Sequence, residues 1–388
     1  MNDEHSRRER TVPGRVLDRL FAGCRTVEGW IASHPWITFA ATGLICVVVE
    51  LVTRGFPRSW DWVWLSGMVA VSLGLPPAFR MNATAEYTVG RLADRGVLTD
   101  GTDELVRQTD RHGELIGRYA GPCLAVFVLI GFATRAVTQQ GADGRSAWFA
   151  DVGNNGYEVL LACLAAFFVG RAAGRVLAIA TLGQRIEKGR LPLRAQLGHV
   201  DGAAGLKPIG DLYFGQAMIV AIPAVWLVVV LCLKSLSVVG GEGWSALGQV
   251  VGQGSGWGPW YFLLLVIAVG LEIAAFIAPM GSFHRAMLSQ KRDYERDADK
   301  QSQILDRLLD ELPAVADEAD RKTAERRIAG IREHNSRVEQ MPTWPVDASV
   351  RRRFTFRNGL LLVPVIANAI GIAVEADSWN TLGDILGG

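Results

Sequence analysis

The sequence predicts an all-α integral membrane protein with about seven transmembrane helices and a cytoplasmic helical hairpin. Charged residues are rare in seven apolar windows. The number of Lys and Arg residues alternates between high and low from one connection to the next. The windows hold 142 of the 388 residues but only six charges, and each is near the ~17–25 residues that cross a bilayer as a helix. They are 35–53, 62–79, 119–137, 157–182, 212–233, 260–280 and 358–374.

Lys and Arg residues in the connections predict the orientation, because basic residues are retained on the cytoplasmic side. From the N-terminal segment onward the connections hold six, two, six, one, five, one and sixteen of them, and the tail after residue 374 holds none. Seven helices with a cytoplasmic N-terminus and an external C-terminus fit this alternation. We therefore expect the inner (cytoplasmic) membrane of a bacterium.

The windows divide the chain into four units. These are a basic cytoplasmic segment (1–34), a six-helix transmembrane region (35–280) with cytoplasmic loops 80–118 and 183–211, the hairpin (281–357), and a last span with an outer tail (358–388). Window 62–79 is rich in Gly, Ser and Ala and ends at Pro76 and Pro77, while 358–374 is short and contains Pro364 and Asn368. Whether these two windows cross the bilayer fully stays open.

Two apolar stripes predict the hairpin. Its first helix carries apolar residues at helical spacing before a break at Pro313, namely Ile304, Leu305, Leu308, Leu309 and Leu312. A second helix follows, with a coiled-coil-like seam at steps of four and three. Its members are Ala324, Ile328, Ile331, Asn335 and Val338. The stripes either pack within the subunit or join two copies in a homo-oligomer.

Ionisable residues at membrane depth raise a functional hypothesis, because burying them in lipid is costly. Glu272 is the deepest of the six, and Arg171 and Arg175 lie one turn apart on one helix face. We expect Glu272 to pair with Arg171, as a gate in an ion or proton pathway or as a structural pair. Gly170 and Gly174 form a small-xxx-small motif that lets another helix approach closely.

The most specific pattern is LGHVDGAAGLKPIG, residues 197–210, which we call the HVDG loop. His199, Asp201, Gly202 and Gly205 indicate a defined turn, because Asp accepts backbone hydrogen bonds and Gly tolerates positive φ. The stretch resembles the HPDxxGGL-type loop of uncharacterised multi-spanning bacterial membrane proteins, with Val200 where that pattern often has Pro. The resemblance implies a shared membrane architecture and no particular activity.

Histidines and one acid are expected near the cytoplasmic helix ends, and a metal site there is the less favoured interpretation. The candidate ligands are His112, His199, Asp201 and His284. In the favoured structural interpretation, Asp201 caps the turn and His199 bonds a neighbouring helix end. HxxxH, HExxH, GxSxG and phosphate-binding glycine motifs are missing, so no cofactor and no catalytic residue are assigned.

We favour a non-enzymatic protein that forms a channel-like or transporter-like pathway for ions or small solutes. One alternative is a membrane sensor or scaffold that docks a cytoplasmic protein through the hairpin and the HVDG loop. Another is a metal-dependent membrane enzyme. The expected surroundings are the lipid bilayer, a second copy or a cytoplasmic protein, and the net charge of +1 argues against nucleic acid.

Overall fold

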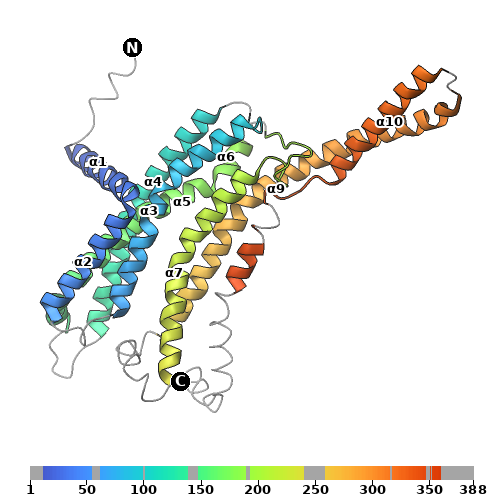
Figure 1. Ribbon diagram of the computed structural model, residues 1–388. Helices are drawn as coiled ribbons and strands as arrows, with labels where there is room; N and C mark the ends of the chain where they lie inside the picture. The colour runs from blue at the N-terminus through green and yellow to red at the C-terminus, as the bar shows by residue number, and fades with distance from the viewer. Residues whose placement is uncertain are drawn as a thin grey trace, which may run out of the picture.

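The computed structural model describes residues 12–54, 62–98, 101–138, 147–188, 193–239, 258–314, 317–346, 350 and 352–359. These residues are mostly helical (Figure 1), and the all-α class is confirmed for them. The labelled elements are α1 (Val12–Ser33), α2 (Pro35–Arg54), α3 (Trp62–Asp94), α4 (Thr102–Thr138), α5 (Ala147–Ala180), α6 (Leu182–Lys188), α7 (Lys207–Val239), α9 (Gly258–Glu311), the 3₁₀ helix η4 (Leu312–Ala314) and α10 (Glu318–Glu339).

Five helices are long and apolar enough to cross a membrane, namely α2, α4, α5, α7 and α9. They contain five of the seven predicted windows. Large apolar side chains on them remain exposed, among them Val52, Phe127 and Leu160. Extensive exposed apolar surface is typical of a protein that contacts lipid.

Whether windows 62–79 and 358–374 cross the membrane stays undecided. Window 62–79 is helical within α3, which is not among the five candidates. Of window 358–374, only Asn358 and Gly359 belong to the described residues. The structure therefore supports five spans, and the count of seven and the orientation of the termini stay predictions.

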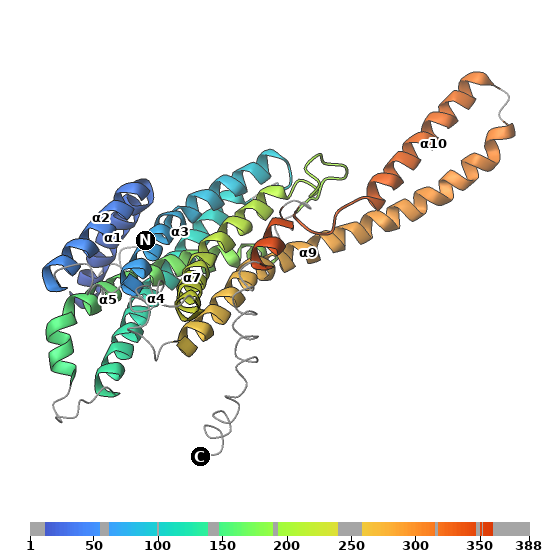
Figure 2. The ribbon, with the colours of Figure 1, turned by 60° about the horizontal axis from the view of Figure 1, so that its bottom comes forward.

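The longest helix, α9, has 54 residues and runs out of the bundle into a projecting hairpin (Figure 2). The chain reverses after Glu311, where η4 contains Pro313, and α10 returns along α9. Asp317 caps α10 by accepting a hydrogen bond from the Ala319 N–H at 3.4 Å. We call residues 281–339 the arm; its first helix is continuous with the last of the five membrane candidates.

The two stripes predicted from the sequence face each other inside the arm. Ile328 and Val338 on α10 are buried, and Leu308 on α9 is half-buried. Asn335 Nδ2 donates a hydrogen bond to Ser302 Oγ at 3.0 Å across the same seam. These stripes therefore pack within one subunit, and a seam between two copies would need another surface.

A large apolar core holds the base of the arm. In this core α3, α5, α6, α7 and α9 meet residues 193–206, 341–346 and Val350. Gln290 on α9 accepts a hydrogen bond from the Ala195 N–H at 2.8 Å and donates one to the Leu193 carbonyl. The chain before the HVDG loop is thereby tied to α9 where the arm leaves the bundle.

Glycines permit the close contact between α4 and α5. A Cβ added to Gly170 would lie 2.8 Å from the Gly121 Cα, and one on Gly174 would lie 2.6 Å from the Gly117 Cα. Both distances are below the 3.0 Å that real Cβ atoms keep. The structure thus places the small-xxx-small motif of α5 against glycines of α4 that are themselves four residues apart.

Candidate functional site

A buried ionic cluster joins α1 to α5. Glu28 on α1 accepts a hydrogen bond from Arg171 Nε through Oε1 and one from Arg175 Nη2 through Oε2. The Glu28 side chain is 0% exposed and that of Arg171 is 4% exposed. Since charges are buried only when they are paired, this cluster fixes α1 against the bundle.

The cluster corrects the expected pairing of Arg171 with Glu272. Arg171 and Arg175 do share one face of α5, but their carboxylate partner comes from a segment outside the apolar windows. The physical reason is that α1 packs against α3. This packing brings Glu28, and not a charge of α9, to α5.

An amphipathic pattern in α1 could have identified Glu28. Phe21, Cys24, Glu28 and Ile31 follow one another at steps of three, four and three, which puts them on one helix face. Ile31 is buried, and Phe21 and Cys24 are half-buried. A carboxylate within such a stripe needs a buried cation.

Aromatic rings and a carbonyl surround the two guanidinium groups. Arg175 Nη1 donates to the Phe79 carbonyl at 2.9 Å, and the guanidinium lies 5.0 Å from the Phe79 ring centroid. The Arg171 guanidinium lies 5.5 Å from the Phe21 ring centroid. Within the described part of the chain its buried Nη1 atom has no hydrogen-bond partner, and Arg171 also helps to line a cavity of about 140 Å³.

Glu272 belongs to a different polar cluster, between α9 and residues 352–359. Its side chain is 0% exposed, and Oε1 lies 3.8 Å from Arg357 Nη2. Neither carboxylate oxygen has a hydrogen-bond partner among the residues that the structure describes. Phe354 stacks on Phe276 with ring centroids 4.2 Å apart, which holds this segment against α9.

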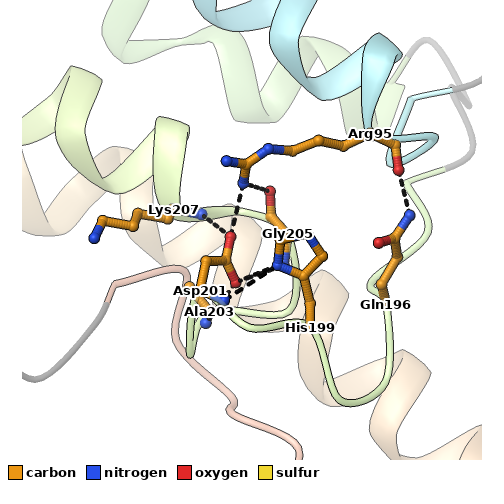
Figure 3. Close-up of polar contacts among 7 residues, drawn as sticks. All are labelled: Arg95, Gln196, His199, Asp201, Ala203, Gly205 and Lys207. Atoms are coloured by element: carbon orange, nitrogen blue, oxygen red, sulfur yellow. Dashed lines mark hydrogen bonds and ion pairs between the residues drawn. The ribbon is translucent and has the colours of Figure 1, made fainter.

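Asp201 organises the HVDG loop (Figure 3). Its Oδ1 accepts hydrogen bonds from the N–H groups of Ala203 and Gly205, both at 3.0 Å. Its Oδ2 accepts one from the Lys207 N–H at 3.4 Å and pairs with Arg95 Nη1 at 2.8 Å. Burial alone would raise the pKa of Asp201, but the two loop N–H groups and His199 together hold it below its ordinary value.

Two glycines give the loop its shape. Gly202 and Gly205 have φ angles of 65° and 86°, a region that side-chain-bearing residues rarely adopt. At Gly205 an added Cβ would also lie 2.8 Å from Val97 Cγ2. The glycines of the motif therefore serve the turn itself.

His199 contacts the turn rather than a neighbouring helix end. Its Nδ1 lies 3.0 Å from Asp201 Oδ1, a contact in which Nδ1 donates, and 3.2 Å from the Asp201 backbone nitrogen, a contact in which Nδ1 accepts. Arg95, whose guanidinium also donates to the Gly205 carbonyl at 3.1 Å, is a residue that sequence reasoning missed. It follows α3 and is 106 residues from Asp201, so no local pattern indicated the contact.

The metal candidates do not form one site. His284 Nδ1 lies 2.6 Å from the Thr343 carbonyl, and its ring stacks on Trp344, whereas His112 is exposed on α4. Over the described ranges, no three His, Cys, Asp or Glu side chains converge as metal ligands.

Comparison with known proteins gives no relative for this chain. No family model, curated protein or solved structure matches it significantly. The fold and the geometry define it only as a helical protein with five candidate membrane spans, and the resemblance of the HVDG loop rests on its residues alone.

Proposed function

We propose that this chain is a membrane-anchored sensor or scaffold whose arm docks a cytoplasmic protein. The observation that carries the proposal is the continuity of α9, which runs from a candidate membrane span to the end of the arm at Glu311. A displacement of α9 within the bundle would therefore move the arm directly. Little of the arm's surface is used by the bundle, so it remains available to a partner.

The HVDG loop supports the same role, because it lies beside the base of the arm. A Cβ on Gly198 would lie 3.5 Å from Arg337 Cδ, in the last turn of α10. Val200, at the tip of the loop, is an apolar side chain that is 99% exposed. A fully exposed Val beside a helical arm is a suitable anchor for a protein partner.

We do not assign docking to the inner stripe of the arm, because Leu305 and Leu308 of α9 and Leu312 of η4 are half-buried. Ile304 and Leu309 flank this stripe and stay exposed. We therefore assign docking to these two residues and Val200, with the surrounding charged residues as a polar rim.

Photo-crosslinking in living cells tests this proposal. A photoreactive residue is placed at Leu309 or Val200, and at Leu308 as the matched control one position away. Docking predicts a protein adduct of the same mass from positions 309 and 200 but not from 308, and its loss in an Ile304→Asp variant. Identical adducts from all three positions, or adducts with lipid alone, would contradict the proposal.

The proposed orientation places the arm and the N-terminus in the cytoplasm of a bacterium. It rests on the alternating numbers of Lys and Arg in the connections. Single cysteines at Asp299, Ser245 and Asn380 should react with a membrane-impermeant maleimide from the inside, the outside and the outside. Reaction of Asn380 from the inside alone would remove the seventh span.

A second candidate function, an ion or proton pathway, is supported by Glu272. A fully buried carboxylate that lies 3.8 Å from the nearest cation of the described residues, Arg357 Nη2, is costly at membrane depth. Proteoliposomes with the pure protein should then release protons or ions, and Glu272→Gln should abolish the flux. Equal flux from the wild type and the variant would exclude Glu272 as a pathway residue.

A further inference from the structure

The cavity beside the Glu28 cluster lies where α1, α3, α4 and α5 meet. Its volume is about 140 Å³, and for comparison a cavity of ~150 Å³ accepts a ligand the size of benzene. Its charged and polar lining consists of Arg25, Asn82, Asp110, Glu114, Arg171 and Arg175. A polar cavity of this size has room for a small ionic molecule.

Two buried atoms of this lining have no hydrogen-bond partner in the described ranges of the chain. One is a donor, Arg171 Nη1, on a side chain that is 4% exposed and is already held through Nε by Glu28. The other is an acceptor, Asn82 Oδ1. Leaving such groups unsatisfied costs folding free energy, so a ligand that brings both an acceptor and a donor would fit here.

The charges of the site also balance. The site has three guanidinium groups, on Arg25, Arg171 and Arg175, and three carboxylates. Asp110 and Glu114 line the cavity with the arginines. Glu28 pairs with Arg171 and Arg175. A bare anion or a bare cation would upset this balance, whereas a neutral dipolar ligand would preserve it.

We propose that this cavity binds a small zwitterion, with its anionic oxygen group on Arg171 Nη1 and its ammonium group near Asn82 Oδ1 and Asp110. A charge-assisted bond to a planar guanidinium suits a phosphate or a carboxylate. The same chemistry occurs in free molecules such as glycerophosphoethanolamine and in the headgroup of a zwitterionic lipid. The site does not depend on the docking role of the arm.

Titration of the full-length protein in detergent tests the proposal. Glycerophosphoethanolamine, a phosphodiester without net charge at pH 7, should bind about tenfold or more tightly than inorganic phosphate or ethanolamine, because only the zwitterion satisfies both orphan atoms. If a lipid is the source, native mass spectrometry of protein from mixed nanodiscs should retain phosphatidylethanolamine in preference to phosphatidylglycerol. Either result supports the site and identifies the source.

Two variants separate binding from folding. Arg171→Lys keeps a charge for Glu28 but removes Nη1, and Asn82→Leu fills the cavity without touching the Glu28 cluster. Both should weaken binding about tenfold, and the control Arg107→Lys, an exposed change on α4, should not. No binding of either source, equal binding of inorganic phosphate, or unchanged binding in a folded Asn82→Leu variant would overturn the proposal and leave a water-filled cavity.

Discussion

Glu28 on α1 and Arg171 on α5, 143 residues apart, form an ion pair whose side chains are both almost completely buried. The pair gives α1 a fixed place against the bundle and holds Arg171 at the edge of a polar cavity.

Glu28→Gln should destabilise the protein by about 3–5 kcal/mol, because it leaves two guanidinium groups near the core without their carboxylate. Thermal unfolding in detergent, followed by size-exclusion chromatography, measures the loss. Glu114→Gln is the control, since Glu114 pairs with Arg25 at 3.3 Å on an exposed surface, where such a pair contributes about 0–1 kcal/mol. Similar effects of the two variants would contradict the buried cluster.

Gly174→Ala should separate α4 from α5, because the new Cβ would lie 2.6 Å from the Gly117 Cα. A loss of about 1–3 kcal/mol is expected for such overpacking. Gly131→Ala on α4 is the control, because a Cβ there would meet no atom of the described residues within 4 Å. It should be neutral or stabilising, since Ala is the better helix former. The unfolding temperatures of the two variants are compared with that of the wild type. An unchanged unfolding temperature of Gly174→Ala would contradict the close contact of α4 and α5.

Asp201→Asn should cost about 1.5–3 kcal/mol at pH 7, because the charged oxygens accept bonds from Arg95 and two loop N–H groups. The folded-state pKa of Asp201 is lowered, so this stability is present above the ordinary value of about 3.9 and is lost as the pH falls through the folded-state pKa. Unfolding curves of wild type and variant should converge in strong acid. Asp211→Asn, an exposed change, should have no comparable effect, and a pH-independent difference would contradict the ionic role of Asp201.

Leu308→Asp and Leu309→Asp should have opposite outcomes although the residues are adjacent. Leu308 is half-buried against α10, so a charge there should lower amide protection across residues 318–339 about tenfold or more. Leu309 is exposed, and its variant should keep that protection while weakening docking. Hydrogen exchange with mass spectrometry measures the amide protection of α10 in both variants. Equal loss of protection in the two would contradict the packing of the seam.

Sequence reasoning recovered those parts of the molecule that depend on local pattern. Five windows, the reversal at Pro313, the close approach at Gly170 and Gly174, and the turn around Asp201 all follow from residues near one another in the chain. The partners of Arg171 and Asp201 did not follow, because Glu28 and Arg95 are more than a hundred residues away. The amphipathic stripe of α1 marks Glu28 as a buried carboxylate, but tertiary placement alone shows that its partner is Arg171 and that Arg95 pairs with Asp201.

The continuity of α9 was also missed, for a related reason. The change from apolar to charged sequence near residue 281 predicts a boundary between a membrane span and a soluble hairpin. Backbone hydrogen bonding is indifferent to that change in polarity, and Pro279 does not end the helix. The helix therefore joins two regions that composition separates.

The distance between spin labels at Leu271 and Asp310 tests this continuity most directly. Both positions are exposed on α9. They are 39 positions apart in one helix, which corresponds to about 58 Å at ~1.5 Å per residue, or slightly less with a bend at Pro279. Pulsed electron resonance on the cysteine-free protein in nanodiscs should give one narrow distribution near this value. A broad distribution, or one centred far below it, would show that the arm moves independently of the membrane span and would contradict the account.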